Sequence, residues 1–117
     1  MVETLRENGV SAYLPGEHEG ICTSPYAVVR QMSGSGSGLG GHASYRVIML
    51  VPQDCPGQLD AFAEAVRTAL APLEARGVTV SALRGAVLTD DRFRAVTTYT
   101  DYISYFSQST DQKENLI

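Results

Sequence analysis

The chain has 117 residues, 44% of them hydrophobic, which is enough for one globular domain with a modest core. Its formal net charge is −4 and it contains no cluster of Lys and Arg, which argues against binding a nucleic-acid backbone, because such binding needs many cations. Neither a membrane helix nor a secretory signal is visible, because no segment approaches roughly 18 apolar residues and the start, MVETLRENG, is charged.

The sequence of the first quarter of the chain predicts a short helix followed by two strands. Residues 2–9 form a helix that ends at Gly9, because glycine readily takes the left-handed conformation that closes a helix. Residues 10–14 can form a short strand, and residues 17–24 form a polar loop. A second strand opens at Pro25 with YAVVRQM, whose centre is β-branched.

The middle of the chain predicts a central strand and a long helix. Residues 42–52, HASYRVIMLVP, alternate as a strand that becomes apolar on both faces, so we place it at the centre of a sheet. After a turn at residues 54–57, apolar residues recur with the spacing of one helical face: Leu59, Phe62, Ala63, Val66, Leu70 and Leu73. Pro72 should kink or interrupt the last turn, and Gly77 should end the helix.

The last part of the chain predicts a long β-hairpin. Residues 78–88 and 93–106 pair across the turn TDDR, where Asp is favoured because its side chain can bond the local backbone. The fold class is therefore α+β, with a mostly antiparallel sheet of about four to five strands, one long amphipathic helix on one face and a short N-terminal helix. We divide the chain into a single domain, residues 1–106, and a polar C-terminal arm, residues 107–117.

The stretch SGSGSGLGG, residues 33–41, contains the spacing G-x-G-x-x-G, which in dinucleotide enzymes binds phosphate. Such a loop must lead from a strand into a helix, whereas both flanks here alternate as strands, so we interpret it as a long, flexible hairpin tip. The tip is either an inert connector or a loop that becomes ordered on a partner. In the second case the partner-contact residues are Ser35, Gly36, Gly38, Leu39 and Gly41.

Candidate catalytic and metal-binding groups form no recognisable site in the sequence. The two histidines have no ligand partner at metal-binding spacing, and Asp90 and Asp91 lie at a turn, where an altered pKa is not expected. Cys22 and Cys55 have no flanking basic residue to stabilise a thiolate. A disulfide between them is possible, but reduced thiols are favoured. We expect no enzymatic activity, no metal and no cofactor.

Aromatic residues crowd the end of the last predicted strand: Tyr99, Tyr102, Tyr105 and Phe106. Because strand residues alternate between faces, one subunit can bury only part of them. They are either ordinary core or part of a subunit interface, where Tyr is enriched. The polar tail cannot build a core, but Leu116 and Ile117 at its end could pack on a neighbouring subunit. All six residues are candidates for a subunit interface.

The order of elements resembles the tail terminator proteins of long-tailed bacteriophages and the related small head-to-tail joining proteins. The resemblance covers residues 1–106 and rests on the strands SPYAVVRQ and SYRVIMLVP, the helix QLDAFAEAVRTALAPL and the closing hairpin with RFRAVTTYTDYISY. It implies a virion subunit, assembled in the host cytoplasm, that forms a homo-oligomeric ring, a hexamer in that family. The ring caps the tail tube, contacts the tube protein and joins it to the head connector or head-closure protein, with DNA only as passing cargo.

Other functions remain open on the sequence alone. A head-closure or other neck protein of the phage is the nearest alternative to a tail terminator. A small ligand-binding or regulatory α+β domain is another, and it should have a concave apolar pocket and be a stable monomer or dimer. A third is an enzyme whose site the sequence does not reveal.

Overall fold

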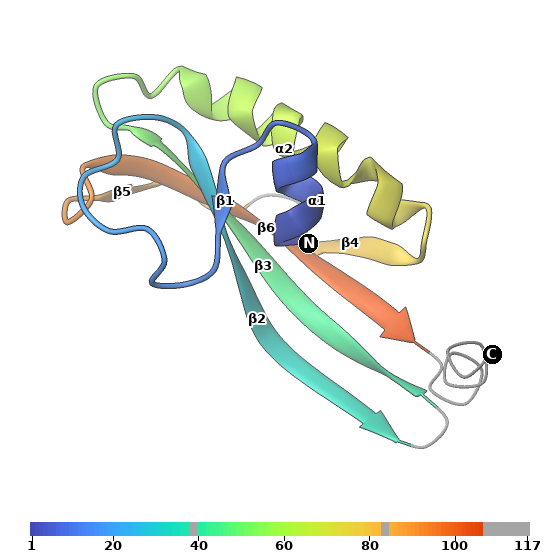
Figure 1. The fold of residues 1–117 in the computed structure, drawn as a ribbon. Helices are drawn as coiled ribbons and strands as arrows, with labels where there is room; N and C mark the ends of the chain where they lie inside the picture. The colour runs from blue at the N-terminus through green and yellow to red at the C-terminus, as the bar shows by residue number, and fades with distance from the viewer. Residues whose placement is uncertain (38–39, 83–84, 107–117) are drawn as a thin grey trace.

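The computed structural model describes residues 1–37, 40–82 and 85–106, which form an α+β fold with a mixed, mostly antiparallel sheet (Figure 1). The elements follow in the order α1 (Val2–Glu7), β1 (Ala12–Tyr13), β2 (Tyr26–Ser37), β3 (Gly40–Pro52), α2 (Gln58–Glu74), β4 (Val78–Ala82), β5 (Leu88–Asp90) and β6 (Ala95–Phe106). The predicted fold class, α+β with a mostly antiparallel sheet, is confirmed. The sheet has six strands within the described ranges, rather than four or five.

The sheet is built around β3. The strand order is β1-β2-β3-β6-β4, β5 also pairs with β6, and among the described strands only β1 and β2 run parallel. Between β2 and β6, β3 pairs with β6 from Gly41, opposite Phe106, to Pro52, opposite Ala95. The central position predicted for this strand is therefore confirmed.

The main core lies between α2 and one face of the sheet. Val47, Met49 and Val51 of β3 point toward α2 and are at most 1% exposed. Val66 and Leu70 of α2 pack against them, as the helical spacing predicts. The helix α1 lies beside α2 and adds Leu5 to the same core. The predicted amphipathic helix thus packs with its apolar side on the sheet.

The helix α2 corrects one expectation about its end. It continues through Pro72 to Glu74 and is not interrupted at the proline. A proline removes one intrahelical hydrogen bond, which is tolerable so close to the last residue of a helix. Gly77 then has a φ of 96°, which glycine adopts without strain.

The glycine-rich stretch also differs from expectation, because two strands run through most of it. β2 continues to Ser37 and β3 begins at Gly40, in register from Ser33 opposite Ser44 to Ser37 opposite Gly40. The long hairpin tip predicted over residues 33–41 is thus wrong, and only residues 38–39 lie outside the described residues. Glycine weakens a strand without forbidding it, and here β6 supplies a second ladder to β3 as far as Gly41.

The predicted C-terminal hairpin is present, but its first strand is divided. Where one strand was expected over residues 78–88, β4 ends at Ala82 and β5 begins at Leu88, with an irregular register between Val80 and Ala82. Between them the backbone N–H of Gly85 donates to the carbonyl of Tyr99 at 2.8 Å. The turn forms as predicted, since a carboxylate oxygen of Asp90 accepts the backbone N–H groups of residues 92 and 93.

Three strands continue past the two helices as an arm. This arm comprises residues 33–37 of β2, 40–44 of β3 and 103–106 of β6, which remain paired in register to their ends. Figure 1 shows it projecting away from α2, and the molecule is about twice as long as it is wide, 51 × 25 × 24 Å. The arm gives the subunit two unlike ends.

Tyr102 and Tyr105 provide a test of this packing, because they point to opposite faces of β6. Tyr102 is 1% exposed beneath α2, whereas Tyr105 is 66% exposed. We expect Tyr102→Ala to lower the free energy of unfolding by about 3–5 kcal/mol, the usual loss for a large buried ring. Tyr105→Ala, the matched control, should change it by no more than about 0.5 kcal/mol in the monomer. Chemical denaturation measures both, and equal losses would contradict the placement.

Candidate functional site: the open face of the sheet

The sheet face opposite α2 carries side chains that the fold leaves half-buried or exposed. We call this the open face, and its residues come from β2, β3 and β6: Val28, Arg30, Arg46, Ile48, Tyr99, Asp101, Ile103 and Tyr105. Among the described residues, the elements that cover it are the loop 14–24 and the turn 91–94, at the end away from the arm. The open face is therefore the candidate site.

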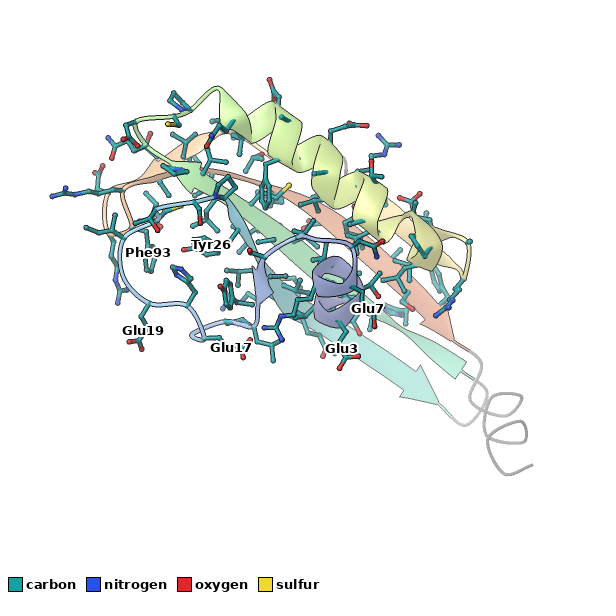
Figure 2. The ribbon with its side chains drawn as sticks, turned by 45° about the horizontal axis from the view of Figure 1, so that its top comes forward. Glu3, Glu7, Glu17, Glu19, Tyr26 and Phe93 are labelled. Atoms are coloured by element: carbon teal, nitrogen blue, oxygen red, sulfur yellow. The ribbon has the colours of Figure 1, made fainter. Side chains whose placement is uncertain are left out.

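A groove of about 760 Å³ lies between that loop and that turn. Its floor is apolar and comes from adjacent strands: Val28, Ile48 and Leu50. The loop contributes His18 and Ile21 to one side, and the turn contributes Arg92 and Phe93 to the other. In Figure 2 the side chains of Tyr26 and Phe93 lie between the loop and the sheet, and Glu19 is on the loop. A concave apolar surface with a few polar groups is the usual form of a binding site.

Three aromatic rings support the loop side of the groove. The His18 ring stacks on Tyr26 with centroids 4.0 Å apart, and Tyr13 packs against both, 5.0 Å from His18 and 5.7 Å from Tyr26. Burial raises the pKa of the Tyr26 hydroxyl, so it keeps its proton well above neutral pH. The Nδ1 atom of His18 is buried and has no hydrogen-bond partner within the described part of the chain.

A backbone hydrogen bond connects the loop and the turn on the two sides of the groove. The backbone N–H of Cys22, in the loop, donates to the carbonyl of Phe93, in the turn, at 2.8 Å. Cys22 and Ala95 are buried behind this bond in a small second core. The loop is therefore attached to the sheet, so the groove has a defined shape in the isolated subunit.

Toward the arm, the open face carries a charged pair on an aromatic ring. Arg46 donates two hydrogen bonds to Asp101, from Nε at 2.8 Å and from Nη2 at 3.0 Å, and its guanidinium carbon lies 3.8 Å from the centroid of the Tyr99 ring. The hydrogen bonds to Asp101 raise the pKa of Arg46. The two side chains are 31% and 22% exposed, and a pair in contact with water adds little stability. Its effect is to fix the orientation of polar groups on this face.

The residues predicted from the sequence as interface residues are only partly brought together. Tyr99 and Tyr105 do lie on the open face, which agrees with their alternation along β6. Tyr102 is wrong as an interface residue, because the same alternation turns its ring into the core beneath α2. The side chain of Phe106 lies outside what the structure describes. So do Leu116 and Ile117.

The predicted partner-contact loop does not form a loop where the structure describes it. Ser35, Gly36 and Gly41 lie in the β2–β3 ladder, opposite His42, Gly41 and Gly36 respectively. Gly38 and Leu39 lie outside the described residues, so their predicted role is untested.

Sequence reasoning missed the groove and the apolar side chains beside it. Ile21, Val87 and Leu88 are 49%, 56% and 60% exposed. Leu88 lies opposite Thr97, whose side chain lines the groove. The available signal was an apolar pair, Val87-Leu88, directly before a turn. Its exposure follows only from the division of β4 and β5.

Comparison with known proteins gave no match, either to a model of a protein family or to a curated protein. The described residues include no group of three or more His, Cys, Asp or Glu that could hold a metal ion. No helix in the described ranges is long and apolar enough to cross a membrane.

Gly85→Ala tests the packing around Tyr99. A methyl group at Gly85 would collide with ring atoms of Tyr99, and that ring is held under Arg46. We expect a loss of about 1–3 kcal/mol in the free energy of unfolding, as for other overpacking changes. In a Tyr99→Ala background the same substitution should have little effect. An equal loss in both backgrounds would contradict the proposed collision.

The two free thiols should differ in reactivity, because Cys22 is buried and Cys55 is exposed. Burial raises the pKa of Cys22, which disfavours its reactive thiolate. We expect iodoacetamide at mildly alkaline pH to modify Cys22 at least about tenfold more slowly than Cys55 in the folded protein. Mass spectrometry after digestion gives both rates, and the denatured chain, where the rates should converge, is the control.

The raised pKa of Cys22 also predicts a dependence of stability on pH. The folded chain keeps this proton at a pH where the unfolded chain begins to lose it. The contribution of Cys22 is therefore fully present below the ordinary thiol pKa and is lost as the pH rises above it. Cys22→Ala should make stability less sensitive to pH in that alkaline range, and denaturation at a series of pH values would show this. An unchanged slope would contradict it.

Proposed function

We propose that this chain is a structural subunit that binds copies of itself, as a ring-forming tail terminator of a long-tailed bacteriophage does. In this role the ring caps the tail tube and joins it to the head connector. The observation that carries the proposal is the open face, an apolar groove and an aromatic arm on the side of the sheet away from α2. The function is assembly rather than catalysis.

The exposed side chains beside the groove support self-association. Ile21 lies on its loop side and Leu88 on its β5 side, each about half exposed or more. A monomer that stays in water rarely keeps large apolar side chains together around a concave apolar floor, and such patches usually mark protein contacts. Burying them in an interface would remove that surface from water.

The charge of the chain is compatible with the place of a tail terminator in the virion. A net charge of −4 without a basic cluster disfavours attachment to a phosphate backbone. DNA could therefore pass through a ring of such subunits without being retained. A head-closure or other neck protein would share this property, and the position of the protein in purified virions, located by labelled antibodies in electron micrographs, would separate the two.

A second candidate function follows from the volume of the groove. At about 760 Å³ it lies within the range of small-molecule sites, and His18, Arg92 and Phe93 offer aromatic and polar contacts. On this alternative the chain is a ligand-binding domain that stays monomeric or dimeric. Fluorescence of an apolar dye that is displaced from a stable monomer by a small ligand would favour it.

Leu88→Asp tests the proposed self-association. We expect native mass spectrometry to find a closed ring, six-fold by analogy with tail terminators, for the unchanged chain at high concentration. Leu88→Asp should shift the equilibrium from rings to monomers, because the interface would have to bury an unpaired carboxylate, which is unfavourable. Leu14→Asp is the matched control, since Leu14 is 53% exposed but lies beside Met1, Val2 and Val29, away from the groove.

Two results would contradict the proposed function. One is an unchanged chain that remains monomeric at every concentration its solubility permits. The other is an assembly that Leu14→Asp disrupts and Leu88→Asp does not, since the contact would then lie on the helix side of the sheet.

A further inference from the structure

We infer that the subunits associate head to tail, with Tyr105 on the arm of one copy inserted into the groove of the next. This inference rests on the proposed function and specifies its interface. The partner is a second copy of this chain, and the contact joins two different surfaces of the open face.

The arm and the groove lie on one face but at opposite ends of the molecule. Thr97 lines the groove, and Tyr105 lies eight residues further along the same strand. Because side chains alternate along a strand and the two residues are an even number of positions apart, both side chains point to the open face. At the usual rise of a strand they are about 27 Å apart. The continuous pairing of β6 with β3 keeps this separation fixed, so Tyr105 cannot enter the groove of its own subunit.

The end of the arm has the composition of an interface core. Tyr105 is 66% exposed, and the centroid of its ring lies 6.2 Å from that of His42, its partner in register. The next pair of residues on the same face, Ser44 and Ile103, is uncharged. Interface cores are enriched in Tyr and depleted of charge, because uncharged groups are desolvated at lower cost.

The groove offers complementary contacts to a tyrosine side chain. Its apolar floor and the rings of Tyr26 and Phe93 suit the aromatic ring. Arg92, on the rim, can donate to the phenol oxygen or lie over the ring. Ile21 and Leu88 stand on either side and would exclude water from the contact, as the surroundings of an interface hot spot do.

The symmetry of the assembly follows from this placement. A contact between two different patches is heterologous, and repeating it produces either a closed ring or an open filament. A two-fold dimer would instead pair each patch with itself. The arm at one end and the groove at the other therefore favour a closed ring over a dimer, in agreement with the proposed function.

Disulfide trapping tests the inference directly. The chain would carry Tyr105→Cys together with Leu88→Cys, in a Cys55→Ser background that removes the exposed native thiol. Leu88 pairs with Thr97, so the two new thiols of one chain are far beyond the roughly 7 Å between Cα atoms that a disulfide can span. Every cross-link between the two introduced thiols must therefore join two subunits. A parallel chain carries Ile21→Cys in place of Leu88→Cys, for the other side of the groove.

We expect mild oxidation to give a ladder of covalent oligomers up to the size of the ring in at least one of the two chains. Each single-cysteine variant, and Tyr105→Cys with Leu14→Cys, should remain monomeric on a denaturing gel. Rings that form without a disulfide in either double variant would contradict the head-to-tail contact and leave the proposed function intact. Covalent dimers of a single-cysteine variant would contradict the head-to-tail contact and indicate two-fold pairing instead. Absence of any self-association of the unchanged chain would overturn both.

Discussion

One long helix can cover only one face of a sheet, and this sheet is apolar on both faces at its centre. In β3, Val47, Met49 and Val51 are buried beneath α2, whereas Ile48 on the other face remains half-buried. Burial of apolar surface is the main favourable term in folding, so a strand of this composition is most stable when both of its faces are covered. At the centre of the sheet, the isolated subunit covers one face completely and the other only in part.

Other parts of the structure cover the second face of the sheet in part. The loop 14–24, attached to the turn through Cys22 and Phe93, covers the open face at one end and buries Leu50. In the middle, Arg46 on the ring of Tyr99 and paired with Asp101 covers apolar surface with a charged group that still contacts water. The groove lies between the loop and the turn, and the arm lies beyond the charged pair. In the proposed assembly, a second subunit covers what is left.

Much of the fold could be predicted from local patterns, because those patterns are set by periodicity. The spacing of Leu59, Val66 and Leu70 fixed the inner side of α2, and alternation correctly placed β3 at the centre and Asp90 at a turn. The strands through the glycine-rich stretch could not be predicted in this way, because β6 supplies the ladder that outweighs the poor strand propensity of Ser and Gly.

The candidate site was less predictable for a related reason. Alternation separates Tyr102 from Tyr99 and Tyr105, but it does not say which face α2 will cover. The pair of Arg46 and Asp101 depends on the register between strands that are 55 residues apart in the chain, which the sequence alone does not specify. The groove needs a loop, a turn and the strands β2, β3 and β6 to be placed together. Each of these is a tertiary property.

Hydroxyl-radical footprinting of the side chains, in dilute monomer and in concentrated protein, tests most directly whether the open face is completed by another subunit. If another subunit completes this face, Ile21, Leu88 and Tyr105 are oxidised readily in the monomer and become protected together as the protein assembles, while Leu14 stays equally reactive. Equal oxidation of all four residues in both samples, or protection of Leu14 alone, would contradict it.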